Sequence, residues 1–116
     1  CVAGSADLCR VWWDSVTGVV ANLDLDWLHD ALLNDLDIFS NSFDATRIIL
    51  CKRVVQEYRR FLILKALRGD LLLPPPPLVD ACWHKHILNT TRYASDCETV
   101  CGYFIHHVSD ETFVRC

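Results

Sequence analysis

The segment from Asp80 to His107 holds most of the side chains in this sequence that could do chemistry. Four of the five histidines and three of the seven cysteines lie in it, namely His84, His86, His106, His107, Cys82, Cys97 and Cys101. Histidine and cysteine are common ligands of zinc and iron. They are also the side chains that titrate or oxidise most readily near neutral pH. This crowding therefore predicts a site, which could be a metal site, a buried polar network or a reactive cysteine.

Helical geometry limits which of these residues can share a ligand. Residues 77–88 are expected to form a helix, because the missing N–H of Pro77 suits a first helical turn. Side chains four positions apart lie on one face of a helix, whereas side chains two positions apart point about 200° apart. Asp80 and His84 should therefore share a face. His84 and His86 cannot bind one ion while the helix stays regular.

Two metal sites fit this geometry. The first comprises His84, Cys97 and one of His106 and His107, with Asp80 as a fourth ligand or as a residue that orients a histidine. The rival site comprises His86, Cys82 and Cys97. The ion in either site would be zinc or iron, although neither site has the C-x-x-C pairs of a zinc finger. A buried polar network around Asp80 and His84 is an open alternative, and a Cys97 nucleophile activated by histidine is a third.

The hydrophobic pattern predicts the elements that must position these residues. Apolar side chains recur at helical spacing, with capping residues before them and glycines after them. Five helices are expected, at about residues 5–17, 24–35, 43–67, 77–88 and 90–101. The first could continue through Gly18 to Asn22. Four prolines from Pro74 form a rigid connector, and the tail after Gly102 is expected to be irregular, ending in a helical turn or a short strand at 109–116. The predicted fold is an all-α compact bundle of about five helices, forming a single domain over residues 1–116.

Composition narrows the class of protein. A hydrophobic fraction of 52% and a charged fraction of 22% are typical of a compact globular domain. The net charge of −4 argues against nucleic acid as the main partner, because phosphate binding needs a basic surface. Basic residues on the third expected helix are better interpreted as a solvated face. No apolar run approaches the roughly 20 residues that a transmembrane helix needs.

The cysteines and the absence of methionine bear on processing. Seven cysteines is an odd number, which leaves at least one unpaired in a monomer. A bridge between Cys1 and Cys116 would close nearly the whole chain and stabilise it by about 4 kcal/mol. Several cysteines could equally be small buried apolar residues. The lack of methionine, even at position 1, favours a fragment or a chain that has lost a leader, such as an organellar protein.

Several motifs together resemble one family. They are E-Y-R-R-F-L at 57–62, V-D-x-x-W-H-x-H-I-L at 79–88, T-x-x-Y-x-x-D-C ending at Cys97, and the glycine-to-double-histidine segment at 102–107. These resemble the domain of unknown function in glycine-rich-domain-containing proteins of plants, fungi and bacteria, over about residues 54–107. The resemblance implies a helical domain and no particular reaction. The pattern residues it implies are Asp80, Trp83, His84, His86, Tyr93, Asp96, Cys97, His106 and His107.

The sequence also departs from that family. It has only four glycines, so it lacks the glycine-rich segments and the RNA-binding region of larger relatives. The proline that often follows the double histidine is replaced by Val108, Ser109 and Asp110. Cys82 and Cys101 are additions to the pattern. They could form a disulfide with each other or with a terminal cysteine.

Three functions follow as hypotheses. The first is a non-catalytic helical interaction module or accessory subunit of a larger assembly, stabilised by the His/Cys cluster through a metal ion or disulfides. It predicts apolar side chains exposed for a protein partner, such as Trp12, Trp13, Phe39 and Phe43. The alternative is a metal-dependent enzyme of unknown reaction with an open coordination position beside His84 and Cys97. A nucleic-acid-binding module is third.

Overall fold

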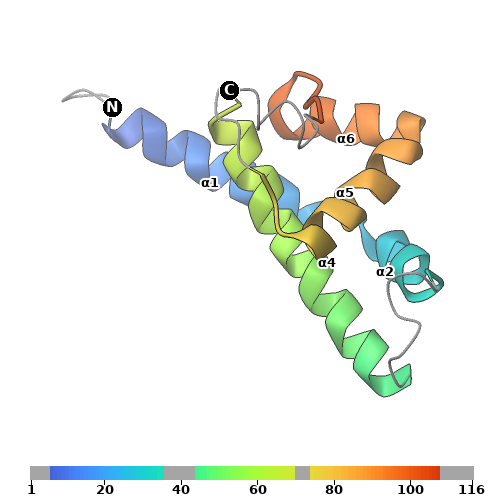
Figure 1. The fold of residues 1–116 in the computed structure, drawn as a ribbon. Helices are drawn as coiled ribbons and strands as arrows, with labels where there is room; N and C mark the ends of the chain where they lie inside the picture. The colour runs from blue at the N-terminus through green and yellow to red at the C-terminus, as the bar shows by residue number, and fades with distance from the viewer. Residues whose placement is uncertain (1–5, 36–43, 70–73, 108–116) are drawn as a thin grey trace.

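The described part of the chain is an all-α bundle, as predicted. The computed structural model describes residues 6–35, 44–69 and 74–107, and no strand occurs among them. Figure 1 shows the long helix α4 crossing the molecule, with the other helices packed around it. The helices are α1 (Ala6–Asn22), α2 (Asp26–Leu33), α4 (Asp44–Leu67), α5 (Pro77–Leu88) and α6 (Thr90–Cys101).

The helices agree with the predicted ones except at the end of α1 and in the caps of α2 and α6. The helix α1 continues through Gly18 to Asn22, because a glycine inside a helix weakens it without ending it. The predicted side-chain caps are absent from α2 and α6, whose first turns follow Leu25 and Asn89. Asp24 instead accepts a hydrogen bond from the backbone N–H of Asp26, at 3.3 Å. Asn89 ends α5 and begins α6, so the two helices meet at a single-residue corner.

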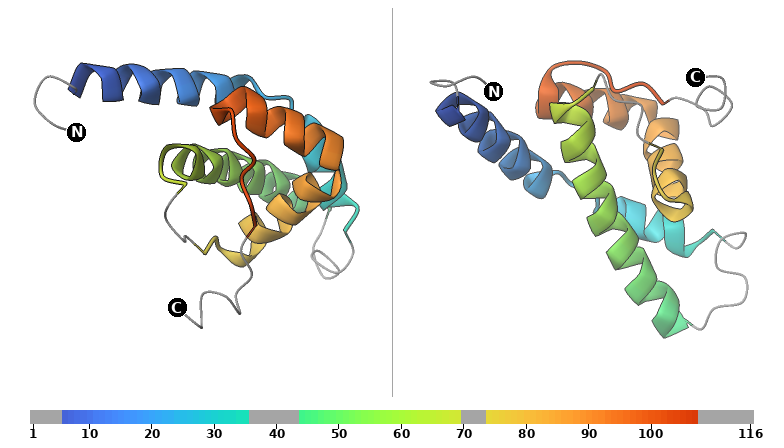
Figure 2. Two further views of the ribbon diagram at one scale, coloured as in Figure 1. Left: turned by 90° about the horizontal axis from the view of Figure 1, so that it is seen from above. Right: turned by 60° about the vertical axis from the view of Figure 1, so that its left-hand side comes forward.

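The core lies where α4 meets the other four helices. α4 packs against each of α1, α2, α5 and α6, and α6 also packs against α1 (Figure 2). The largest side chains that are almost fully enclosed are Trp83, Tyr58, Tyr93, Leu25, Leu28, Leu32 and His86. Two tyrosines, a tryptophan and a histidine in this set require internal hydrogen bonds, because a buried polar group without a partner is costly.

The segment after α6 turns back across the bundle. Gly102 has a left-handed backbone, with φ of 77°, which ends α6 and reverses the chain. The Tyr103 hydroxyl donates to the backbone oxygens of Lys65 and Ala66, at 3.0 and 2.9 Å, at the end of α4. Ile105 is buried, and its backbone oxygen accepts a hydrogen bond from the Tyr93 hydroxyl. These contacts place His107 beside the first turns of α5.

We expect Gly102→Ala and Gly18→Ala to change stability in opposite directions. A Cβ at either position would meet nothing within 4 Å, so only the backbone differs. At Gly102 the left-handed backbone should cost about 1–2 kcal/mol. At Gly18, inside α1, alanine should add about 0.5–1 kcal/mol. Urea unfolding followed by circular dichroism measures both, and a stabilised Gly102→Ala variant would contradict the assignment of the turn.

The disulfide between Cys82 and Cys101, one of the pairings that the sequence left open, does not form. Cys51, Cys82, Cys97 and Cys101 are all free thiols. Cys82 is fully enclosed in the core, whereas the Cys101 thiol lies near the surface and contacts the backbone oxygens of Cys97 and Tyr103. The proposed Cys1–Cys116 bridge, the predicted end of the tail at 109–116, and Phe39 and Phe43 lie outside the described residues. Among the described helices, none combines the length and the apolar character needed to cross a bilayer.

Candidate metal site

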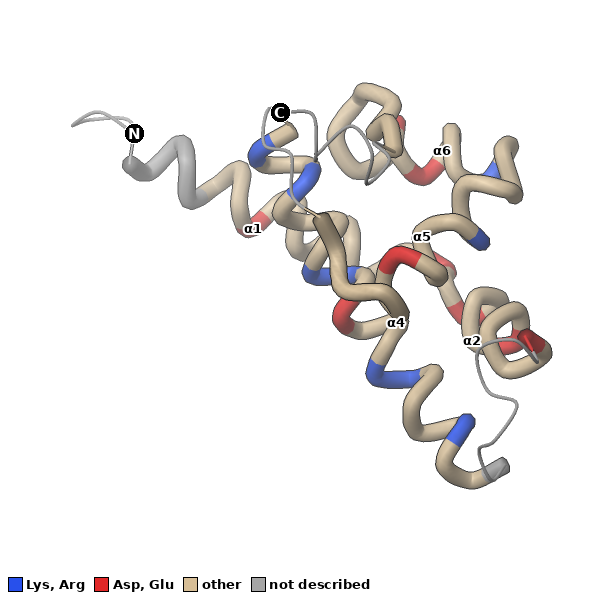
Figure 3. Tube along the Cα trace, viewed as in Figure 1, with Lys and Arg blue, Asp and Glu red and all other residues tan. Residues whose placement is uncertain are grey.

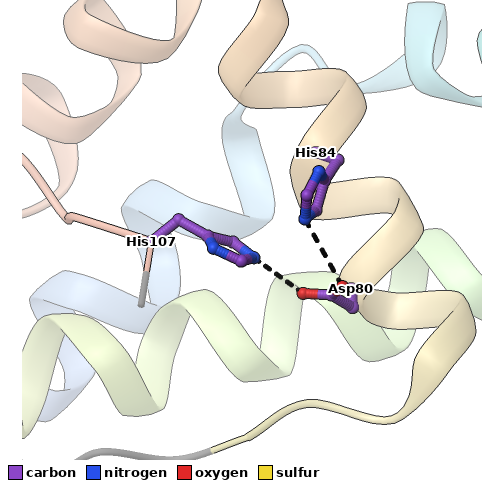
Figure 4. Close-up of side chains that lie close together, drawn as sticks. All are labelled: Asp80, His84 and His107. Atoms are coloured by element: carbon purple, nitrogen blue, oxygen red, sulfur yellow. Dashed lines mark hydrogen bonds and ion pairs between the residues drawn. The ribbon is translucent and has the colours of Figure 1, made fainter. Parts of the chain in front are cut away.

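Three potential metal ligands meet where the returning tail reaches α5. His107 Nε2 lies 2.8 Å from Asp80 Oδ1, and His84 Nε2 lies 3.4 Å from Asp80 Oδ2 (Figure 4). The centroids of the two imidazole rings are 4.4 Å apart. One ligand atom from each of the three side chains lies within 4.8 Å of the other two. Asp80 is therefore bracketed by two imidazole nitrogens.

Helix geometry positions two of these residues, and the tail after α6 positions the third. Asp80 and His84 are four positions apart on α5 and so lie on one face. His107 comes from the tail, and its ring lies 4.4 Å from the ring of Trp83. The Trp83 indole N–H donates to the Tyr93 hydroxyl at 2.9 Å, which fixes the surface behind His107. The cluster thus has a rigid wall on its inner side.

The outer side of the cluster is open. The His84 side chain is 57% exposed, and the Asp80 and His107 side chains are partly exposed. A hollow of about 350 Å³ adjoins Asp80 and His84 along α5. Its wall includes Lys85, which forms an ion pair with Asp35 at 2.8 Å. A ligand could therefore approach the cluster from solvent.

The donor set suits a divalent transition ion. Two imidazoles and one carboxylate with open positions are the ligands of mononuclear iron sites and of many zinc sites. As a plain ion pair between partly exposed groups, the same cluster would stabilise the fold by only about 0–1 kcal/mol. Coordination would use the Nε2 atoms that now face Asp80, so binding would require both nitrogens to be unprotonated.

A second, buried network surrounds His86. The Tyr58 hydroxyl lies 2.6 Å from His86 Nδ1, and His86 Nε2 lies 2.8 Å from Asp96 Oδ2. A neutral ring with its proton on Nε2 satisfies both contacts, because Tyr58 then donates to Nδ1 and Nε2 donates to Asp96. Burial lowers the pKa of His86, and the hydrogen bond to Asp96 opposes this effect. Both ring nitrogens are thus engaged inside the protein, with only 1% of His86 exposed.

The remaining candidates lie apart from the three-residue cluster. Cys97 is buried, and contacts with the Ile105 backbone and the Tyr93 side chain only partly offset the rise that burial causes in its pKa. Burial raises the pKa of Cys82 to about 12. Raised pKa values disfavour the thiolates that a nucleophile or a metal ligand requires. The exposed ring of His106 packs near Phe104, with centroids 4.9 Å apart. Of the seven predicted ligands, the structure brings together Asp80, His84 and His107 and leaves out Cys82, His86, Cys97 and His106.

Two residues that support these sites, Tyr58 and Trp83, lie in the quoted motifs but were not predicted to contact a histidine. Tyr58 completes the His86 network from α4, but in the sequence it is one member of an apolar helical stripe. Trp83 packs behind His107, whereas the sequence indicated it only as a residue of the family pattern. Neither has a spacing signal relative to its partner, because both contacts join separate elements. The available hints were the E-Y-R-R-F-L string that contains Tyr58 and the V-D-x-x-W-H-x-H-I-L string that contains Trp83.

The fold and site define a class: a helical domain with a surface His/Asp cluster backed by a buried aromatic and histidine network. The sequence model of the UCP032817-like family matches residues 29–115, and the chain belongs to that family. The matched range contains α4, α5, α6 and both networks, whereas α1 precedes it. No curated protein and no solved structure is significantly similar to the chain.

Proposed function

We propose that this domain is a non-catalytic helical interaction module that binds one divalent transition ion, zinc or iron, through Asp80, His84 and His107. The observation that carries the proposal is the convergence of three ligand atoms within 4.8 Å on a surface open to solvent. Two ligands come from α5 and one from the tail. A bound ion would therefore clamp the tail onto the bundle and stabilise the module.

The coordination chemistry agrees with a module that works in an assembly. Three protein ligands leave at least one position of a tetrahedral ion free. Water or a side chain of a protein partner would fill it. We also propose that the chain is related to the domain of glycine-rich-domain-containing proteins, because Asp80, His84 and His107 all belong to the motif pattern quoted above.

Exposed aromatic residues on α1 support the interaction role. Trp12 and Trp13 are 48% and 47% exposed, and their neighbour Val11 is more exposed still. The N-terminal half of α1, where they lie, projects beyond the rest of the bundle (Figure 1). Adjacent exposed tryptophans are unusual on a surface without a partner, and Trp is enriched at the centres of protein interfaces.

Metal titration tests the proposal. Protein stripped with a chelator should bind one equivalent of Zn²⁺ in calorimetry, and elemental analysis should find the ion retained after desalting. At free zinc about 100 times the dissociation constant, the free energy of unfolding should rise by about 2.7 kcal/mol. His84→Ala and His107→Ala should lose binding.

The matched control is His106→Ala, which removes the neighbouring histidine and should bind zinc as the wild type does. Equal binding by the wild type and the His84→Ala/His107→Ala double variant would place any ion elsewhere. No binding by the wild type, under conditions where the protein is folded, would overturn the metal assignment.

A second candidate function is a metal-dependent enzyme, favoured by the hollow of about 350 Å³ beside His84. An enzyme needs an exchangeable position on its ion. The visible spectrum of the cobalt-loaded protein should then change when a small anion such as acetate is added. A spectrum insensitive to added anions would mean that the ion has no exchangeable position, which would contradict the enzyme.

A further inference from the structure

A separate apolar groove lies between α4 and the start of α5. It has a volume of about 420 Å³. Its floor consists of Val54, Phe61 and Val79, which are almost fully buried, and its walls include Leu64 and Leu78, which are 47% and 38% exposed. Along α4 the lining extends from Leu50 to Leu64, about 21 Å of helix at 1.5 Å per residue. The groove is thus long, open and almost wholly apolar.

A basic edge borders this groove. Arg53 and Arg60 lie on its rim, and Arg53 also lines a second hollow on α4, together with Lys52 and His29. At 100° per residue, Arg53 and Arg60 fall on the side of α4 next to the apolar lining, whereas Lys52 lies on the far side of the helix. Glu57, between the two arginines in the sequence, also lines the groove. Figure 3 shows that Lys and Arg recur along α4, with acidic residues also present on this helix.

The cations on this edge are incompletely neutralised. Arg60 pairs with Glu57 at 2.9 Å, on the exposed surface. Arg53 forms no ion pair with a residue that the structure describes. The chain as a whole carries a net charge of −4, so this edge is a positively charged region on an acidic protein. A complementary ligand would combine an apolar face with negative charge beside it.

We propose that the groove binds an acidic amphipathic α-helix of a partner protein. Apolar side chains at positions i, i+4 and i+7 of such a helix would fill the groove, and acidic side chains on one flank would face Arg53 and Arg60. The length of the groove corresponds to about four helical turns. The assignment supplies the partner chemistry for the interaction role proposed above and rests on that role, but not on the metal ion.

The direct test uses a designed probe. A fluorescein-labelled peptide of about 18 residues, with leucines at helical spacing and glutamates on the flank, is titrated with the protein, and its anisotropy is followed. We expect it to bind at least about tenfold more tightly than the same peptide with lysines in place of glutamates, which is a difference of about 1.4 kcal/mol. Backbone amide shifts in the protein should map to α4 and the start of α5.

Matched variants locate the binding surface. Leu64→Asp and Leu78→Asp place a charge in the groove walls and should weaken binding at least about tenfold. Leu88→Asp adds the same charge at a residue that is 79% exposed and outside the groove, so affinity should not change. Arg53→Glu should remove the preference for the acidic peptide over the basic one. Circular dichroism of each variant verifies that the fold is retained.

Four results would each overturn the proposal, and two of them would identify a different occupant of the groove. Equal affinity for both peptides would remove the role of the basic edge. Binding unaffected by Leu64→Asp and Leu78→Asp would place the peptide elsewhere. Dimerisation abolished by Leu64→Asp would make a second copy the occupant, and a fluorescent fatty acid bound there in preference to the peptide would make it a lipid. None of these outcomes affects metal binding, which the zinc titration measures independently.

Discussion

Replacing Trp83 by alanine is expected to lower the free energy of unfolding by about 3–5 kcal/mol, the range for truncating a large buried aromatic side chain. Trp83 is almost fully enclosed and packs edge-to-face on Phe61, with ring centroids 4.8 Å apart. Its indole N–H also donates to Tyr93. Domains of this size are stable by about 5–15 kcal/mol, so the variant should lose a large fraction of the total free energy of unfolding.

Two further variants separate packing from hydrogen bonding at Trp83. Tyr93→Phe keeps the ring volume but removes the acceptor of the Trp83 N–H and the donor to Ile105, which should cost about 1–3 kcal/mol. Trp12→Ala truncates a half-exposed tryptophan of the projecting α1 and should change stability by less than about 1 kcal/mol. Urea unfolding measures all three. A Trp83→Ala variant as stable as Trp12→Ala would mean that Trp83 does not pack as described.

The free energy of unfolding is expected to fall as the pH drops below 6.5, the ordinary pKa of histidine, because of His86. Burial lowers the pKa of His86 in the folded protein, so the unfolded chain takes up this proton first. Stability contributed by neutral His86 is therefore present above pH 6.5 and is lost as the pH falls toward the lowered folded value. One proton gives a slope of at most about 1.4 kcal/mol per pH unit.

The groups that contact His86 suggest a control variant for this pH prediction. Tyr58 donates from α4, Asp96 accepts on α6 and favours the protonated ring, and Arg92 on α6 disfavours it. His86→Gln can still bond to Tyr58 and Asp96 but does not titrate, so its pH slope in this range should be flatter. His106→Gln, at an exposed ring outside the network, should keep the wild-type slope. Identical slopes for the wild type and His86→Gln would contradict a titrating His86.

The helices were largely predictable because their determinants are local. Pro77 and Gly102 sit at the first position of α5 and just after α6, where a missing N–H and a left-handed backbone favour them. The continuation of α1 through Gly18 could not be decided from the sequence, since tertiary packing of Val16 and Val20 on the core outweighs the cost of one glycine. The predicted caps failed for a similar reason: packing stabilises α2 and α6 without them.

Half of the site was also predictable, because it depends only on the spacing of residues within one helix. The spacing of Asp80 and His84 places them on one face of α5, and the spacing of His84 and His86 sends them to different sides. The structure has His84 exposed at the cluster and His86 enclosed in the core. No long-range information is needed for these relations, because a rigid helix imposes them on any chain that forms it.

Which residue completes the cluster was decided only by the tertiary structure. The sequence predicted Cys97 as a ligand together with one of His106 and His107. It could not choose between the two histidines, because the tail after Gly102 has no periodicity that assigns a direction to its side chains. Tyr103 and Ile105 anchor the tail to α4 and to Tyr93, and this register points His107 at Asp80. Cys97 is buried by the same anchors. The sequence by itself thus determined the helices and the Asp80–His84 half-site, whereas long-range hydrogen bonds and burial selected His107 and excluded Cys97.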